Sequence, residues 1–199
     1  MDPNTPDKFP NTVNIGVVGQ SDAGKGSLIN ALRGIAPRNP EAAKTGVSAT
    51  CQEETKRYQL SDSQFLCELP AYGSYKWPTQ HFSEQTKLLK YDALIIVVSV
   101  GASDSLQITQ QAKDAGIPFH IVRAKADRDI EDGLRDNGLR PEETMQKISE
   151  EMSTLPSRNR LRPEGLYHLN LASKDQGGDK PSLAHLQKAL LSQKKLDKW

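Results

Sequence analysis

The sequence predicts an α/β fold in which a mostly parallel, six-stranded sheet carries helices on both faces. Apolar runs rich in β-branched residues alternate along the chain with segments whose apolar residues recur at helical spacing. The run Ala93–Val98 is apolar on both faces, as a central parallel strand requires. A glycine-rich stretch, Gly19–Ser27 (GQSDAGKGS), lies between the first expected strand and the first expected helix. Because parallel strands end at the same edge of a sheet, ligand-binding groups are expected there.

The individual elements follow from spacing and turn residues. Apolar, β-branched runs indicate strands at 13–18, 48–60, 64–69, 93–98, 118–123 and 166–172. Apolar residues at helical spacing indicate helices at 24–34, 80–90, 104–115, 141–153 and 181–191. Gly34 stands where a left-handed C-cap would end the first helix. Ser61, Asp62 and Ser63 favour a turn, so the second and third strands are expected to form a hairpin.

Length and composition limit the classes of protein. A chain of 199 residues can bury a core without disulfides or a metal, and we expect one domain at 13–199 after a flexible tail at 1–12. Lys and Arg total 26 against 25 Asp and Glu, so no net field favours nucleic acid as a partner. No apolar run resembles a targeting signal or spans a bilayer, which predicts a cytoplasmic protein. Cys51 and Cys67 are expected to be free thiols, and the histidines lack metal-ligand spacing.

The stretch Gly19–Ser27 follows the phosphate-binding pattern G-x-x-x-x-G-K-[ST] at all but its last position, between the strand and the helix that the pattern requires. In such a P-loop the backbone N–H groups and the helix N-terminus converge on phosphate oxygens, while a lysine adds positive charge. A chance glycine-rich turn is the alternative. The residues expected to bind the phosphates of a nucleotide are Gly19, Asp22, Ala23, Gly24, Lys25, Gly26 and Ser27.

The exception in the P-loop is Gly26. The pattern places Ser or Thr after the lysine, where its hydroxyl binds Mg²⁺. Ser27 comes one residue too late, and neighbouring helical residues project about 100° apart, so its hydroxyl is expected to point toward the α-phosphate. The sequence therefore predicts weakened Mg²⁺ binding.

The end of the third expected strand, CELPAYG, stands where a GTPase has D-x-x-G, whose aspartate holds Mg²⁺ and whose glycine senses the γ-phosphate. Glu68 keeps the negative charge on a longer arm. Ala71 replaces the glycine, and Gly73 is a candidate for a relocated hinge. Tyr72 takes the place where small GTPases carry a water-orienting glutamine. We expect Glu68, Ala71 and Gly73 to belong to a switch segment.

Two further motifs follow at expected strand ends. RAKAD matches [NT]-K-x-D at Lys125 and Asp127: the aspartate would accept hydrogen bonds from guanine, and the lysine stem would cover the base. Ala124 lacks the side-chain tether of Asn or Thr. The weaker motif LNLASKD places Ser173 and Lys174 where an S-x-K loop contacts guanine. An ordinary surface Lys and Asp is the alternative, but the order of motifs favours a P-loop NTPase with a Ras-like G domain.

These residues resemble the immunity-related, or interferon-inducible, GTPase family. The resemblance rests on VNIGVVGQSDAGKGSLINALRG, EAAKTGVSAT, ELPAYG in place of D-L-P-G-x-G, and IVRAKAD in place of R-T-K-x-D. It implies binding of GTP and GDP with Mg²⁺, slow GTP hydrolysis, self-association of G domains, and action at intracellular membranes in innate immunity. It also makes Thr45 the candidate switch threonine, which with Glu68 would hold any Mg²⁺ that is retained; an ordinary loop threonine is the alternative. Family members carry helical segments on both sides of the G domain.

Three functions remain open from the sequence. The first is a guanine-nucleotide-binding switch or assembly domain in which hydrolysis is slow or absent. The second is a pseudo-GTPase interaction module that binds no nucleotide, favoured by the number of altered motif positions. The third, a P-loop kinase or ATPase, is disfavoured by the K-x-D and S-K order. No residue is singled out as catalytic.

Overall fold

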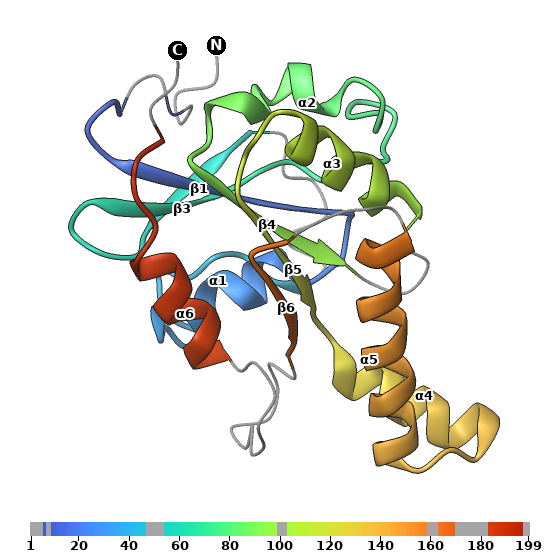
Figure 1. The fold of residues 1–199 in the computed structure, drawn as a ribbon. Helices are drawn as coiled ribbons and strands as arrows, with labels where there is room; N and C mark the ends of the chain where they lie inside the picture. Colours follow the sequence, from blue (N-terminus) through green and yellow to red (C-terminus); the bar gives the residue numbers. More distant parts are fainter. Residues whose placement is uncertain are drawn as a thin grey trace.

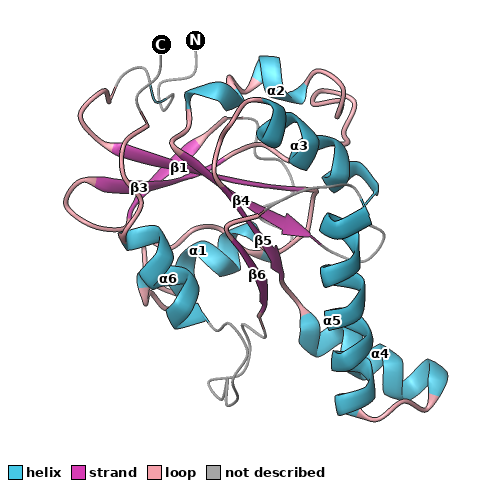
Figure 2. Ribbon diagram, viewed as in Figure 1, coloured by secondary structure: helices cyan, strands magenta, loops and turns pink. Residues whose placement is uncertain are grey.

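The computed structural model describes residues 6, 9–46, 54–98, 103–158, 163–169 and 183–196. Within these residues six strands form one sheet (Figures 1 and 2). The strands are β1 (Val13–Gly19), β2 (Lys56–Gln59), β3 (Gln64–Glu68), β4 (Ala93–Val98), β5 (Phe119–Arg123) and β6 (Gly165–His168). The helices are α1 (Lys25–Arg33), α2 (Phe82–Gln85), the 3₁₀ helix η3 (Leu88–Lys90), α3 (Ser103–Asp114), α4 (Ala126–Asn137), α5 (Pro141–Arg158) and α6 (Leu183–Leu191).

The sheet has the order β2-β3-β1-β4-β5-β6. All neighbouring strands run parallel except β2, which pairs antiparallel with β3 as the predicted hairpin. The α/β fold class and the mostly parallel, six-stranded sheet are thus confirmed. The carboxyl ends of β1, β4 and β5 lie at one edge of the sheet, where their following loops can meet.

Helices cover both faces of the sheet and enclose two separate apolar cores. In Figure 1, α2, α3 and α5 lie on one side of the sheet, and α1 and α6 lie on the other. Leu94 and Ile96 of β4 pack into the first core, whereas Ile95 and Val97 pack into the second. This alternation explains why the β4 run is apolar throughout, since each face of a doubly covered strand is buried.

One predicted helix is wrong. Residues 80–90 form two short pieces, α2 and η3, in place of one helix, because Lys87 between them has a left-handed backbone with φ of 52°. The Thr86 hydroxyl donates to the Phe82 carbonyl 2.7 Å away and so binds a carbonyl of the last turn. Phe82 and Leu88 are both fully buried. The apolar spacing therefore came from two anchor residues and not from one continuous helical face.

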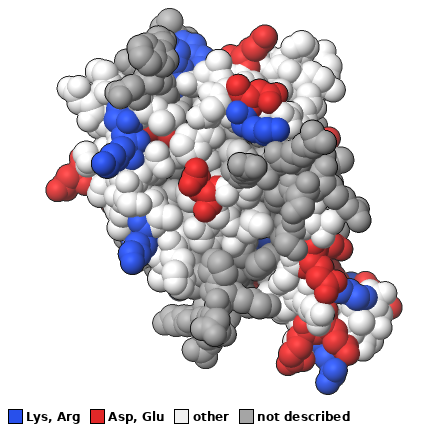
Figure 3. Space-filling model, viewed as in Figure 1, with Lys and Arg blue, Asp and Glu red and all other residues white. Residues whose placement is uncertain are grey.

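Helix α4 was not predicted. Its first residue follows the K-x-D lysine, and only Ala126 and Gly133 are buried, so it presents almost no apolar stripe. Gly133 lets α4 cross α5 closely, because a Cβ built there would lie 2.5 Å from Thr144 Oγ1. On the face shown in Figure 3, acidic and basic side chains are interspersed over this helix pair. Such a surface has no single sign of charge.

Other bounds differ from expectation. The largest differences are that the second strand begins at Lys56, α5 continues to Arg158, and β6 ends at His168. Residues 48–53 and 170–172, which belonged to predicted strands, lie outside the described residues, as do 181 and 182 of the last predicted helix. The left-handed cap at Gly34 is confirmed, with φ of 65°. Among the described residues, no helix combines the length and the apolar character needed to cross a membrane.

A buried carboxylate joins the two ends of the described chain. Asp92, which precedes β4 and is fully buried, accepts hydrogen bonds from the Asn14 N–H (2.8 Å) and the Leu196 N–H (3.1 Å). The Lys195 ammonium lies 3.2 Å from the same carboxylate and donates to the Thr12 carbonyl at 2.9 Å. The segments before β1 and after α6 are therefore held together at the edge of the sheet opposite the P-loop.

Candidate nucleotide-binding site

The P-loop connects β1 to α1 and has the backbone geometry of an anion cradle. Gly24, which precedes α1, has φ of 98°, a value that L side chains rarely adopt. Asp22 also has a left-handed backbone, with φ of 58°. The turn therefore aims the free N–H groups of the α1 N-terminus into the loop, where they and the helix dipole favour a phosphate.

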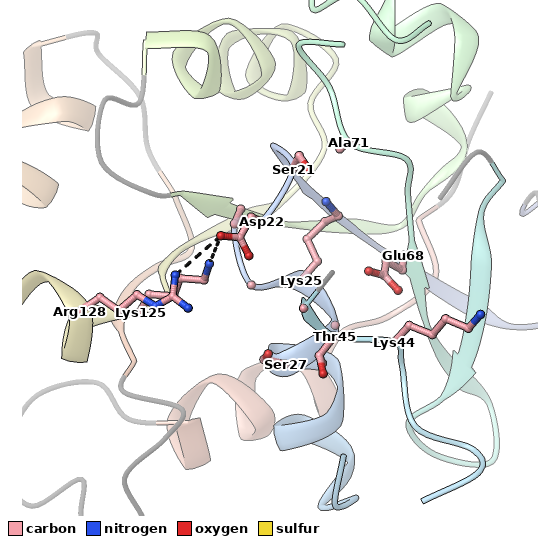
Figure 4. A pocket seen from close by; sticks show the side chains of 14 residues that line it. Ser21, Asp22, Lys25, Ser27, Lys44, Thr45, Glu68, Ala71, Lys125 and Arg128 are labelled. Atoms are coloured by element: carbon pink, nitrogen blue, oxygen red, sulfur yellow. Dashed lines mark ion pairs between the residues drawn. The ribbon is translucent and has the colours of Figure 1, made fainter. Parts of the chain in front are cut away.

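Two cavities meet at this loop. The first, of about 270 Å³, lies over the P-loop (Figure 4) and is lined by Ser21, Asp22, Ala23, Gly24, Lys25, Gly26, Ser27, Lys44, Thr45, Gly46, Glu68, Ala71, Lys125 and Arg128. The second, of about 340 Å³, is lined by Gly24, Ser27, Asn30, Ala31, Ile35, Pro37, Thr45, Ala124, Lys125, Asp127 and Arg128. They share Gly24, Ser27, Thr45, Lys125 and Arg128. Most of the predicted site residues thus line one or both of these adjacent cavities.

Lys25 is held inside the P-loop by the loop itself. Its ammonium donates to the carbonyls of Gly19 and Gln20, each at 3.0 Å, and the residue is only 9% exposed. Burial lowers the pKa of Lys25 to about 8, with the nearby Glu68 carboxylate opposing this shift. A phosphate beside the ammonium would favour its charged form. Gly19 lines neither cavity, and its contribution is the backbone carbonyl that accepts a hydrogen bond from Lys25.

The position of the missing hydroxyl is filled by backbone. A Cβ built on Gly26 would overlap the carbonyl oxygen of Lys44 and would lie 3.5 Å from Thr45 Cγ2. The loop that carries Thr45 can therefore pack onto α1 only because residue 26 has no side chain. A Ser or Thr at this position would collide with that loop.

Glu68 lies at the end of β3, is 2% exposed and lines the first cavity. The Tyr58 hydroxyl donates to its Oε2 at 3.3 Å. Burial, and then the Glu68 charge, raise the pKa of Tyr58. Figure 4 shows the carboxylate on the same side of the cavity as Lys25.

These residues fit Mg²⁺ poorly, although the family that the sequence resembles usually implies this ion. Glu68 and Thr45 supply one carboxylate and one hydroxyl at the cavity wall, but the P-loop hydroxyl is absent and the Lys44 carbonyl takes its space. Among the described residues, no cluster of three or more His, Cys, Asp or Glu side chains could hold a metal. A Mg²⁺ ion would thus depend on phosphate oxygens and water for most of its ligands.

The segment after β3 is fastened to α3. The Tyr72 hydroxyl is 2.8 Å from the Ser105 hydroxyl, and Tyr72 is 2% exposed. Gln20 donates to the Asp104 carboxylate at 3.0 Å beside Gly73, whose φ of 83° requires a glycine-like backbone. Ala71 lines the first cavity, whereas Gly73 lines neither cavity. The tyrosine in the glutamine position thus points into the protein.

The K-x-D turn joins β5 to α4. Lys125 precedes α4 with φ of 62°, and its ammonium lies 2.6 Å from the Asp22 carboxylate. Asp127, in the first turn of α4, lines the second cavity. Just before the turn, the buried Arg123 guanidinium binds Asp129 at 2.8 Å and fixes the start of the helix. Ser173 and Lys174, the predicted S-x-K contacts, lie outside the described residues.

Several lining residues were not predicted. Ser21, Lys44 and Gly46 carry no motif of their own, and Ile35 and Pro37 lie in the loop after α1. Arg128 directly follows Asp127 and could have been noticed as a cation at the start of a helix. Trp77, in the loop after β3, is half-buried and packs edge-on against Phe82, with ring centroids 6.5 Å apart.

Comparison with known proteins decides the family. The model of the family described as "Interferon-inducible GTPase (IIGP)" matches residues 7–197. The chain belongs to the interferon-inducible GTPase family. It is 31% identical over 157 residues to interferon-inducible GTPase 5 of Rattus norvegicus, covering 76% of this chain and 33% of that protein. It is 32% identical over 120 residues to interferon-inducible GTPase 1 of Mus musculus, covering 59% of this chain and 29% of that protein. The chain thus spans about a third of the length of these family members.

Solved structures show the same fold at low identity. NFeoB of S. thermophilus bound to GDP.AlF4⁻ and K⁺ aligns with a TM-score of 0.54 and 18% identity, covering 92% of this chain and 62% of that one. Toc33 of Arabidopsis thaliana, in a dimerization-deficient mutant, aligns with a TM-score of 0.57 and 16% identity, covering 92% of this chain and 84% of that one. At these identities the likeness establishes the P-loop GTPase fold alone.

Proposed function

We propose that this chain binds GDP and GTP through the P-loop and the K-x-D turn and acts as a nucleotide-controlled switch or assembly domain. The observation that carries the proposal is that the two cavities have lining residues in common, among them Gly24, Ser27 and Lys125. A diphosphate over Lys25 would lead directly into a pocket that contains Asp127. A carboxylate there accepts hydrogen bonds from guanine N1–H and N2–H₂, a pairing that adenine does not offer.

Slow or absent hydrolysis is part of the proposal, and the other end of the site supports it. Gly26 brings no hydroxyl, Ala71 stands in the place of the switch glycine, and Tyr72 is bonded to Ser105 rather than directed at a water. Glu68 and Thr45 would hold any Mg²⁺ that binds with the nucleotide. Catalysis of phosphoryl transfer rests on charge stabilisation by such groups, so their loss slows turnover more than binding.

Partners and location are proposed from the family. We expect guanine nucleotide as the ligand, self-association through the G domain at 13–199, and no nucleic acid. Association with intracellular membranes would come through partners or through segments outside this chain, which spans only about a third of its relatives. The cytoplasm is the proposed compartment. Ser173 and Lys174 are the proposed contacts to the guanine carbonyl.

Isothermal titration calorimetry tests nucleotide binding. GDP is expected to bind with and without Mg²⁺, and ATP is expected to compete poorly with GTP. A matched titration of the Lys25→Met variant controls for weak anion binding elsewhere on the chain. Absence of GDP binding both with and without Mg²⁺ would overturn the proposal, and a preference for ATP would point to a kinase or an ATPase.

The second candidate is a pseudo-GTPase that keeps the fold as an interaction module. Two observations favour it: Lys25 is already satisfied by the carbonyls of its own loop, and the Lys44 carbonyl closes the space beside Gly26. Lys25→Ala separates the two candidates. If the variant keeps the wild-type unfolding temperature in GDP and the wild-type self-association, the interaction module is supported and nucleotide control is rejected.

A further inference from the structure

The phosphate loop carries a negative charge of its own at Asp22. The residue lies between the two glycines of the P-loop, and its side chain is 64% exposed within the lining of the first cavity. Its left-handed backbone, with φ of 58°, suits Asp, Asn or Gly better than other residues. A carboxylate here stands where an incoming phosphate must approach the loop.

The Asp22 carboxylate is paired with the cations of the K-x-D turn. Lys125 Nζ lies 2.6 Å from Asp22 Oδ2, and an Arg128 guanidinium nitrogen lies 3.8 Å from the same oxygen (Figure 4). Lys125 also has a left-handed backbone, so both ends of the pair hold conformations that are costly for a residue with a Cβ. Such conformations persist where surrounding contacts enforce them, and they cluster at functional sites.

The pair lies at the junction of the two cavities. Lys125 and Arg128 line both of them, and Asp22 lines the first. The two loops also approach closely through their backbones, since a Cβ built on Gly24 would lie 3.1 Å from Ala124 Cβ. A nucleotide that spans both cavities must therefore pass beside this ion pair.

Several charged residues that line the first cavity are held by other groups of the protein itself. Lys25 is bound to carbonyls of its loop and faces Glu68, while Lys125 and Arg128 face Asp22. Hydrogen bonding to Lys125 holds the pKa of Asp22 below its usual value, so Asp22 stays charged at neutral pH. A polyanion entering the site would meet this charge, and Coulomb repulsion over such distances grows with each phosphate.

We propose that Asp22 sets the ligand preference of this site: its carboxylate pairs with Lys125 and Arg128 and opposes added phosphate charge. The proposal rests on the proposed nucleotide function. Asp22 is then a specificity-determining residue that weakens GDP and GTP binding more than GMP or guanosine binding. It also speeds release, because the carboxylate competes with the bound phosphates for the same two cations.

The test compares wild type with Asp22→Asn and Asp22→Gly, two residues that accept the left-handed backbone. Calorimetry with guanosine, GMP, GDP and a GTP analogue gives the affinity for each ligand. Both variants are expected to bind GDP roughly tenfold more tightly than wild type, with a smaller gain for GMP and none for guanosine. The gain for GDP is expected to shrink between low and high salt, because ions screen the charge.

Asp132→Asn is the matched control. Asp132 also pairs with an arginine on α4, at 2.7 Å from Arg135, and it lines neither cavity. The control changes net charge by the same amount and is expected to leave all four affinities at the wild-type values. Thermal unfolding without ligand shows that each variant is folded.

The outcomes separate this inference from the proposed function. If wild type binds no GDP but Asp22→Asn does, the proposed function fails and the inference stands. If wild type binds GDP and both Asp22 variants bind it equally well or more weakly, the inference alone is overturned. An equal gain in affinity for guanosine and GDP would show that Asp22 affects the shape of the site and does not act through phosphate charge. This result would also overturn the inference. If neither wild type nor the variants bind GDP, both fail.

Discussion

In one half of the candidate site, formed by the P-loop and the K-x-D turn, both the backbone geometry and the side chains match the sequence motifs. Gly24 has the required left-handed backbone, Lys25 lies within the loop, and Asp127 lines the adjoining cavity. In the other half, where a γ-phosphate and Mg²⁺ would lie, Gly26 has backbone packed against it and Tyr72 is turned into the protein. Holding a nucleotide and processing it thus depend on different residues, and a chain can keep the first set while it changes the second.

The largest expected effect tests the phosphate-binding half. Lys25→Met is expected to weaken GDP binding roughly 100-fold, because hydrogen bonds from a charged donor contribute about 1.5–3 kcal/mol each. The empty protein should lose little stability, since a buried ammonium is costly in itself. Calorimetry and thermal unfolding measure the two quantities. Unchanged GDP affinity would show that this half has lost its function as well.

The base-binding part of the same half has its own test. Asp127→Ala is expected to weaken GDP binding roughly 30-fold, or about 2 kcal/mol, since two hydrogen bonds to a carboxylate are lost and water replaces part of them. Inorganic pyrophosphate serves as the control ligand, because it would contact the P-loop alone. Equal losses for GDP and pyrophosphate would place Asp127 outside the base pocket.

The altered half is tested by returning the missing side chain. Gly26→Ser is expected to lower the free energy of unfolding by about 1–3 kcal/mol, because its Cβ overlaps the Lys44 carbonyl. Gly26→Ala adds the same Cβ without the hydroxyl and should cost a similar amount in denaturant unfolding. A Ser variant that is fully stable and binds GDP more tightly with Mg²⁺ would show that this half remains competent.

The pH dependence of binding sharpens the role of Lys25. Burial lowers the pKa of Lys25 to about 8, and bound phosphate would raise this pKa, so binding would take up a proton above that pH. GDP affinity, measured in EDTA from pH 7 to 9, should fall as pH rises through 8, by at most about tenfold per pH unit. The Lys25→Met variant should lack this part of the decline. Parallel profiles for both proteins would exclude Lys25 as its source.

The smallest effect concerns the hydrogen bond that connects the segment after β3 to α3. Tyr72→Phe removes a buried hydrogen bond to Ser105 and should lower the free energy of unfolding by about 1 kcal/mol. GDP affinity should not change, because Tyr72 lines neither cavity. Ser105→Ala is the reciprocal variant. Weaker GDP binding in both variants would mean that the two halves are coupled through α3.

The sequence predicts most of this fold because its signals are local and strong. β4 is apolar on both faces, and the P-loop glycines force a turn between strand and helix. Helix α4 escapes such reasoning because it buries only Ala126 and Gly133 and is held by α5. The helix expected at 80–90 fails at Lys87, since a lysine gives no local sign of a left-handed backbone.

The candidate site was predictable where a motif fixes the backbone, and less so where tertiary contacts decide. The spacing of the P-loop pattern locates Lys25, and the K-x-D pattern together with its place after the fifth strand locates Asp127. The Lys44 carbonyl beside Gly26 and the Asp22–Lys125 pair are not, because each joins segments far apart in the sequence. The absence of a hydroxyl at residue 26 could be seen in the sequence, but what fills its space could not.

The buried Asp92 carboxylate holds the two ends of the described chain together. Because Lys195 donates to the Thr12 carbonyl and Leu196 to Asp92, the segments before β1 and after α6 are neighbours. A short linker could therefore join them, and new ends could be opened in the turn between β2 and β3 at Ser61–Ser63. Such a circular permutant would keep the P-loop contiguous. The order in which the strands are synthesised would then be separable from their arrangement in the sheet.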